Sequence, residues 1–314
     1  MALLFVPGWA ALGGAEDNSA PAPKLAAPKL QPLFAIYMHM DQGFFNNPMG
    51  IFYNRRTDEI LVADTQNDLI GIFNGKGISV FSLGANEDIK EPVKAITDAK
   101  GQILVLDRER KIKILNYRGE YVKDLELPGL PGKISIGALA IDGEGNLYIA
   151  ENESSQVFVY DPEMRLKMRF GGKGAEMGQF QSIGGIAVDH SGRIYVTDHL
   201  ATPVQVFDGS GKFLLGWGKH ETGVQNFSLP SGIAVDSKGR VFIVDTLRHE
   251  IKIFDGEGKF LGRDGGFGYR PGDVAFPVDI AIDPADRIYV VEKVGKRVQV
   301  FQEIEVVPNP KPQS

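Results

Sequence analysis

Six carboxylates recur along the chain at nearly constant spacing, and each ends a short apolar run. Successive members are 43, 44, 47, 47 and 47 residues apart, and the set is Asp64, Asp107, Glu151, Asp198, Asp245 and Glu292. Carboxylates that converge from several segments are ligands for Ca²⁺. A short acidic side chain also caps the backbone N–H groups of the loop that follows it. Because every copy carries the acid, whereas a catalytic site would break the symmetry, the pattern favours caps over a metal ring.

Histidines are the other candidate metal ligands, because the sequence has no cysteine. The five are His39, His190, His199, His220 and His249. Absence of cysteine excludes disulfides, thiolate metal sites, cysteine nucleophiles and covalent haem attachment. The motifs Gly-x-Ser-x-Gly and His-Glu-x-x-His do not occur either. The sequence therefore assigns no catalytic residue, no metal ligand and no cofactor, although the residue types leave calcium and zinc open.

The carboxylates belong to a repeated block of short strands. In residues 185–207, GIAVDHSGRIYVTDHLATPVQVF, an apolar β-branched run precedes an Asp-His-Ser-Gly turn, a second run that ends at Asp198, a loop and a third run. The turn residues and the β-branched runs are typical of antiparallel strands. A fourth run follows at 212–218. Six copies of four strands, repeated every 43–47 residues, predict an all-β, six-bladed β-propeller.

Ring closure needs a strand from outside the last copy, which stops after its third run at 297–301. Residues 34–40, FAIYMHM, are strand-like and precede the first copy. We expect this N-terminal strand to complete the sixth blade, because closure removes an exposed sheet edge. The propeller is accordingly expected over residues 34–304.

The two ends of the chain differ from the repeats in composition. Residues 1–15 are largely apolar and uncharged and resemble a secretory signal, although no basic residue precedes the apolar run. Residues 16–33, rich in Ala, Pro and Lys, are predicted to be a linker, and residues 305–314 a flexible tail. We therefore expect a periplasmic or secreted protein without stable membrane insertion, or a cytoplasmic one if the first segment is not a signal.

Residues 232–260, GIAVDSKGRVFIVDTLRHEIKIFDGEGKF, resemble the repeats of the NHL-repeat proteins. The resemblance covers residues 34–301 and is strongest in the fourth and fifth copies, whereas the sixth copy has Asp279 and Asp286 where the family usually has Gly. It implies a six-bladed propeller. It does not imply one function, because one fold carries many functions.

Candidate binding residues lie where the copies differ from one another. Propellers usually bind on the face formed by the loops between the second and third strands and the loops between blades, and loops of variable sequence often carry binding. His199, Arg248 and His249 lie in such loops. Lys94 and Asp279 replace Gly at the start of the inner strand in blades two and six, which flank blade one. An ion pair or a polar ligand site at the mouth of the axial channel is therefore one hypothesis, and the alternative is that both are solvated side chains at the start of a strand.

Three functions are compatible with these observations, and the first two are a binding scaffold and an enzyme. The regular repeats and the lack of a catalytic motif favour an exported, monomeric, non-enzymatic scaffold that binds a protein, peptide or glycan. The resemblance to peptide-amidating lyases and lactonases implies the alternative, a propeller enzyme with a metal in its central channel. Zinc in such a site would require His199, His220 and His249 to converge, and calcium would require carboxylates and carbonyl oxygens.

RNA binding is a third hypothesis, because some animal NHL proteins bind RNA. It would rest on basic residues in the loops, namely Arg108, Arg110, Lys111, Arg248, Lys293, Lys296 and Arg297. The net charge of the chain is −6, however, and a general nucleic-acid binder needs a basic field. A nucleic-acid partner is therefore not expected.

Overall fold

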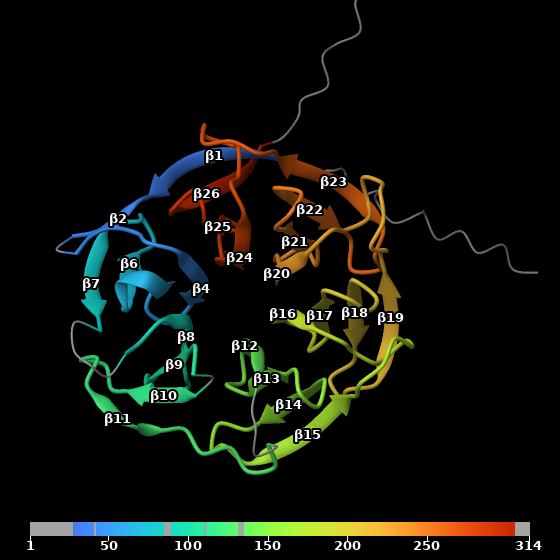
Figure 1. Cartoon of the computed structure of the whole chain (residues 1–314), viewed down its shortest axis with the longest axis horizontal. Coiled ribbons are helices and arrows are strands. Elements are labelled where there is room, and N and C mark those ends of the chain that lie inside the picture. Colours follow the sequence, from blue (N-terminus) through green and yellow to red (C-terminus); the bar gives the residue numbers. More distant parts are fainter. Residues whose placement is uncertain (1–27, 41, 85–88, 110, 131–134, 305–314) are drawn as a thin grey trace, which may run out of the picture.

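The structure is a computed structural model that describes residues 28–304 except 41, 85–88, 110 and 131–134. Six four-stranded antiparallel sheets stand around a central axis, as Figure 1 shows. The chain is a six-bladed, all-β propeller, as predicted. The expected signal segment, most of the expected linker and the tail lie outside the described residues. Within the described part, no helix is long and apolar enough to cross a bilayer.

The blades follow the chain in order, with the innermost strand first in each. Blade one comprises β4 (Pro48–Asn54), β5 (Glu59–Asp64), β6 (Leu69–Asn74) and β7 (Ser79–Leu83). Blade two comprises β8 (Pro92–Thr97), β9 (Ile103–Asp107), β10 (Ile112–Leu115) and β11 (Tyr121–Asp124). Blade three comprises β12 (Ile136–Ile141), β13 (Leu147–Glu151), β14 (Gln156–Tyr160) and β15 (Leu166–Gly171).

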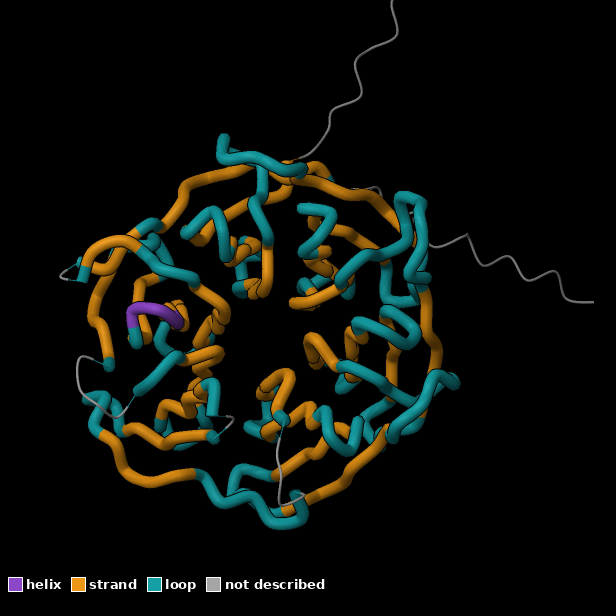
Figure 2. The backbone as a smooth tube through the Cα atoms, in the orientation of Figure 1, coloured by secondary structure: helices purple, strands orange, loops and turns teal. Residues whose placement is uncertain are grey.

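The second half of the ring repeats this order. Blade four comprises β16 (Ile183–Val188), β17 (Ile194–Asp198), β18 (Val204–Phe207) and β19 (Phe213–Trp217). Blade five comprises β20 (Pro230–Val235), β21 (Val241–Asp245), β22 (Glu250–Phe254) and β23 (Phe260–Gly265). Blade six comprises β24 (Pro277–Ile282), β25 (Ile288–Glu292), β26 (Arg297–Ile304) and β1 (Lys29–Ile36). The described helical structure is one 3₁₀ turn, Thr65–Asn67, in blade one (Figure 2).

Blade six is closed by the N-terminal strand, as predicted, but the boundaries of that strand were wrong. β1 spans Lys29–Ile36 and pairs antiparallel with β26, so it begins inside the segment expected to be a linker. Residues Met38–His39 form β2, which leaves the blade and pairs with β3 (Gly43–Phe44) in a separate hairpin. Pro32 made this segment resemble a linker in the sequence, because proline is rare inside strands. It is tolerated because β1 is an edge strand, and the register shifts beside it.

Neighbouring blades pack a bulky face against a slim one. On β16, Ile186 faces the cluster that contains Val157 of blade three, whereas Ala187 faces the cluster that contains Ile233 of blade five. This confirms the alternation of large and small residues predicted for the inner strands. The interdigitation allows the seams to reach the packing density of a protein interior, and so fixes the positions of the inner strands.

The seam between blades five and six also contains an acid-sensitive ion pair. Arg240, which is buried, donates to both carboxylate oxygens of Glu303 on β26, at 3.1 and 2.8 Å. This contact, opposed by burial and aided by Lys238, lowers the pKa of Glu303 from 4.5 to about 2.

Because the folded pKa is depressed, the pair stabilises the fold above pH 4.5, and the stabilisation is lost as pH falls toward 2. We expect Glu303→Gln to lower the free energy of unfolding by about 1–2 kcal/mol at pH 7, after allowing for partial solvent exposure. Urea unfolding at pH 7 and pH 3 checks this, with the exposed Glu257→Gln as control. An equal loss at both pH values would contradict the assignment.

Candidate functional site at the axial cavity and loop face

The six recurring carboxylates are buried caps, as predicted, but among the described residues Asp64, Asp245 and Glu292 accept backbone N–H groups of the loop that enters their blade and not of the loop that follows them. Each is at most 1% exposed. Glu151 is typical: it accepts the N–H groups of Ser135, Glu153 and Ser154 at 2.7–2.9 Å and the Ser154 hydroxyl at 2.6 Å. Burial alone would raise the pKa of Glu151, but these hydrogen bonds outweigh it and lower the pKa. Carboxylates used in this way hold loops in place.

Histidines from different blades do not gather at one point. His220 contacts the carbonyl of Ala201 at 2.9 Å, and His39 is fully buried between Asp64 and Ser82. Among the described residues, no group of three or more His, Asp or Glu side chains is arranged to hold a metal ion. The structure thus does not bring His199, His220 and His249 together as the zinc hypothesis required.

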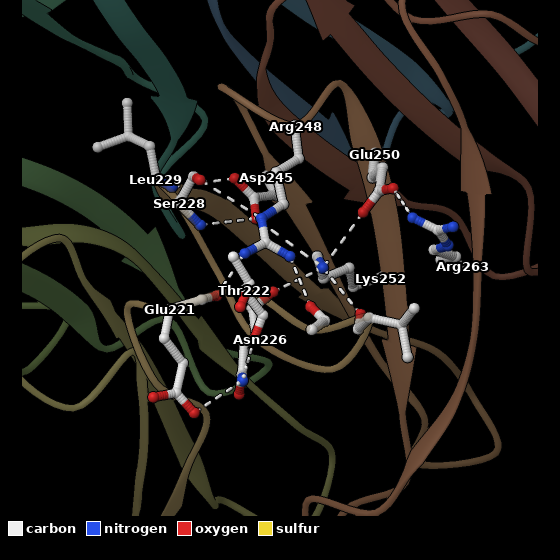
Figure 3. A network of polar contacts seen from close by, with 12 residues as sticks. Glu221, Thr222, Asn226, Ser228, Leu229, Asp245, Arg248, Glu250, Lys252 and Arg263 are labelled. Carbon is white, nitrogen blue, oxygen red and sulfur yellow. Dashed lines mark hydrogen bonds and ion pairs between the residues drawn. The ribbon is translucent and has the colours of Figure 1, made fainter.

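Arg248, a candidate binding residue in the sequence, is held by the loop between blades four and five. Figure 3 shows its guanidinium among the loop residues between blades four and five. It donates to the carbonyl oxygens of Glu221 and Gly223, the latter at 2.6 Å, and lies 3.6 Å from Asp245. These contacts occupy the guanidinium, so Arg248 braces the loop.

His249 also supports a loop from within. Its Nδ1 accepts the N–H of Phe276 at 3.1 Å, and its ring packs against Phe276 and Phe267 with centroid distances of 4.5 and 4.8 Å. Burial lowers the pKa of His249, and Asp245 opposes this only in part. The residue packs against the exposed Phe267 and does not itself line the axial cavity.

Lys252 is the centre of the network in Figure 3, and sequence reasoning missed it. The side chain is fully buried, and its ammonium donates to the carbonyls of Val224 and Asn226 at 2.9 and 2.7 Å. It also lies 3.2 Å from a carboxylate oxygen of Glu250. Burial lowers the pKa of Lys252. Aligning the third strands would have revealed it, since Lys113, Gln205 and Gln299 occupy the equivalent position.

The inner strands enclose an axial cavity of about 570 Å³, which Lys94, Asp279 and His199 line. The Lys94 ammonium pairs with Asp279, in agreement with the ion-pair hypothesis, and joins blades two and six across blade one. The same Asp279 oxygen accepts the N–H of Ile51 at 2.8 Å. Both ends of the pair are only partly exposed, so the lysine is held in a fixed position in the wall.

His199 brings a second polar group to this cavity. Its Nδ1 lies 3.3 Å from the Ser182 hydroxyl, while its buried Nε2 has no hydrogen-bond partner. Burial lowers the pKa of His199, against the influence of Asp198, so the imidazole is neutral at pH 7. Three of the five predicted residues therefore line one cavity, and Arg248 and His249 lie outside it.

Three successive blades carry an exposed apolar residue at the same position of the loop face, which was not predicted; these three residues are called the apolar strip. Leu200, Leu247 and Val294 each lie two residues after the recurring carboxylate of blades four, five and six, and they are 66, 55 and 43% exposed. The equivalent residues of blades one to three are polar: Gln66, Glu109 and Glu153. The repeat alignment contained this pattern, at the position directly after the one that holds His199.

Comparison with known proteins agrees with this architecture. The NHL repeat model matches residues 227–254, which form most of blade five. Over 137 residues the chain is 27% identical to the protein Brain tumor of Drosophila melanogaster. The match covers 41% of this chain and 13% of that protein.

Solved structures of similar fold include a gluconolactonase from Xanthomonas campestris, with TM-score 0.62 and 15% identity over 91% of this chain and 99% of that one. A second, provisionally named a gluconolactonase, has TM-score 0.62 and 14% identity over 87% and 94%. At these identities the likeness concerns the fold alone. The repeat match and the ring of six blades lead to one conclusion: the chain is a six-bladed β-propeller with an NHL repeat at residues 227–254.

Proposed function

We propose that this propeller is a non-enzymatic binding protein that engages a protein partner through the loop face of blades four to six. The observation that carries the proposal is the strip formed by Leu200, Leu247 and Val294. Single exposed apolar residues are normal on any protein surface. Three at the same position of three successive blades are not expected from chance exposure, and they form a surface suited to an apolar partner segment.

Loops between the blades extend this surface. Large exposed apolar side chains are present in the loops that enter blades four, five and six, namely Met177, Val224, Phe267 and Tyr269. Phe267 packs against His249, with ring centroids 4.8 Å apart, and against Tyr269 at 6.0 Å. Aromatic side chains that are already positioned lose little entropy on binding, and they are common at the centres of interfaces.

Basic side chains in the loops of these blades indicate the chemistry of the partner. The side chains of Lys173, Arg270 and Lys293 have no ion pair with a carboxylate among the residues that the structure describes. A segment with apolar side chains flanked by Asp or Glu would complement both the strip and these cations. We therefore propose an amphipathic, acidic peptide segment as the element of the partner that docks here.

RNA is less well supported by the same residues. Arg297 is buried and paired with Glu292 at 2.7 Å, Arg108 pairs with Glu91, and Arg248 donates to loop carbonyls. Lys296 donates to Asn46. Arg110 lies outside the described residues. Cations that are already engaged offer little to phosphate groups, and this supports a protein partner.

Selection from a phage-displayed library of random peptides tests the proposal. We expect enriched peptides that combine large apolar residues with Asp or Glu. Leu247→Asp should weaken their binding at least 10-fold, because it places a carboxylate in the strip and beside those of the peptide. Fluorescence anisotropy with one enriched peptide measures the effect.

The control for this experiment is Leu214→Asp, which changes an exposed leucine on β19, away from the strip. It should leave peptide affinity unchanged. Failure to enrich any peptide, enrichment of Lys- and Arg-rich peptides, or equal binding by both variants would contradict the proposal.

Hydrolysis of a lactone is the second candidate, and His199 is the observation that favours it. A neutral imidazole with a free Nε2 in a cavity could serve as general base toward water. Two solved chains of similar fold are named as gluconolactonases. Hydrolysis of glucono-1,5-lactone, measured with and without added Ca²⁺ or Zn²⁺, separates the two functions. Turnover by the wild type that His199→Gln abolishes would favour the enzyme over the scaffold.

A further inference from the structure

We propose that the axial cavity binds the carboxylate of a small organic acid with an apolar body, which enters from the loop face. This site does not depend on the apolar strip, although Lys293 takes part in both proposals. The cavity has a volume of about 570 Å³, within the range of small-molecule sites. Its lining combines apolar inner-strand side chains with two lysines, one arginine, one aspartate and one histidine.

Lys94 supplies the first cation. The equivalent positions of blades one, three, four and five carry only Gly50, Ala138, Gly185 and Gly232, so this lysine is the long side chain of the inner ring. Its stem packs over Gly50, where an added Cβ would lie 3.0 Å from Lys94 Cδ. The pair with Asp279 fixes its ammonium, which retains two further N–H donors beyond that contact.

Lys293 supplies the second cation. It follows the recurring carboxylate of blade six, and its equivalents in three other blades clasp the next blade: Thr65 donates to the carbonyl of Pro92, Asn152 accepts the N–H of Ile183, and Thr246 donates to the carbonyl of Pro277. Lys293 makes no such contact among the described residues and lines the cavity instead. Its ammonium is therefore available to a ligand.

His199 adds a neutral hydrogen-bonding group at the same level. It too follows a recurring carboxylate, and its Nε2 lies beside Gly184 of the cavity wall, where an added Cβ would approach it to 2.3 Å. In the tautomer in which Ser182 donates to Nδ1, the Nε2–H is a free donor. A buried donor without a partner costs free energy, and a ligand oxygen would remove that cost.

The balance of charge selects the ligand. At the end of the cavity toward the loop face, Lys94 and Lys293 carry two positive charges and Asp279 one negative charge, which leaves a single net positive charge there to neutralise, whereas Arg55 lines the cavity from the β4–β5 turn at the opposite end. A monoanionic carboxylate satisfies this, whereas a dianionic phosphate would lie against Asp279. Apolar wall residues such as Val93, Ala138 and Ile233 complement an alkyl or aromatic body.

Calorimetric titration of the full chain with hexanoate, and with hexanamide as the uncharged match, tests the site. We expect hexanoate to bind and hexanamide to bind at least 10-fold more weakly. Lys293→Met, which breaks no described contact, should weaken hexanoate binding about 10-fold, and Lys94→Met at least as much. Asp279→Asn should strengthen it, because Asn retains an acceptor for Lys94 and removes the competing charge. Lys212→Met, an exposed lysine outside the cavity, is the control.

Equal affinity for hexanoate and hexanamide, no binding of either, or unchanged binding in Lys293→Met would overturn the proposal. Weaker binding in Asp279→Asn would contradict the charge argument in the same way. The carboxylate could belong to a free organic acid or to the C-terminus of a peptide. A short peptide with a free C-terminal carboxylate, compared with its amide and with hexanoate, distinguishes the two. Preference for the free peptide over hexanoate would assign the site to a peptide end, and the reverse preference to a free organic acid.

Discussion

A chain that lacks residues 1–36 is expected not to form a stable propeller. The deletion removes β1 and leaves one edge of β26 unpaired over seven registered positions. It also removes Leu30 and Ile36, each at most 5% exposed and each part of a different core cluster. Burial of one such side chain is worth about 1.5–3 kcal/mol. Together with the lost strand pairing, this approaches the ~5–15 kcal/mol by which domains are stable.

Near-ultraviolet circular dichroism and size exclusion of residues 37–314 measure this effect. We expect aggregation or the loss of a cooperative melt. Deletion of residues 1–27 alone is the control and should preserve the melt, because β1 is retained. A synthetic peptide of residues 28–37 should restore part of the ordered signal to the longer deletion. A cooperative monomer that melts within a few degrees of the full chain would disprove the role of β1.

Lys252→Met is expected to lower the free energy of unfolding by about 3–5 kcal/mol, the usual cost of removing one partner of a buried ion pair. Methionine fills a similar volume but donates no hydrogen bond. The carbonyls of Val224 and Asn226 would lose their donor, and Glu250 and Asp245 would lose a neighbouring positive charge. The loop that carries Val224, an exposed residue beside Asn226, should loosen as well.

Lys252→Gln is the matched control, because glutamine occupies this position in blades four and six. It should cost less than methionine, since its amide can still donate to a carbonyl. The folded pKa of Lys252 is lowered by burial, so the folded state binds fewer protons than the unfolded state and wild-type stability should rise relative to Lys252→Gln as pH approaches 10.5. Urea unfolding from pH 7 to pH 10 measures both effects. Equal stability of the methionine and glutamine variants would refute the proposed role.

The architecture was predictable because it depends on short-range patterns that the chain repeats. Turn residues, β-branched runs and a recurring acid are each local patterns. One copy of such a pattern predicts a strand or turn only weakly, but six copies at a constant spacing predict the repeat. β1 was misplaced for the same reason: Pro32 and the lysines around it are locally typical of a linker. Only the pairing with β26, more than two hundred residues away, makes this segment a strand.

The candidate site was predictable where it broke the symmetry of the repeats. Lys94 and Asp279 could be paired from sequence because each replaced a small residue in a blade next to blade one. Arg248 and His249 could not be placed, since a sequence does not reveal whether a loop side chain bonds to its own loop. The buried position of His39 was harder to predict. Its ring lies against Gly71, where an added Cβ atom would be only 2.6 Å from the imidazole.

The pairing of β1 with β26 also sets how the ring would respond to force. The strands are antiparallel, and Lys29 lies opposite Ile304, so both ends of the described chain leave from the same end of the ladder. Tension applied to the two termini would load these hydrogen bonds one after another, as a zipper opens, and would not shear them all at once. The contact that makes the ring continuous is thus also its point of least mechanical resistance.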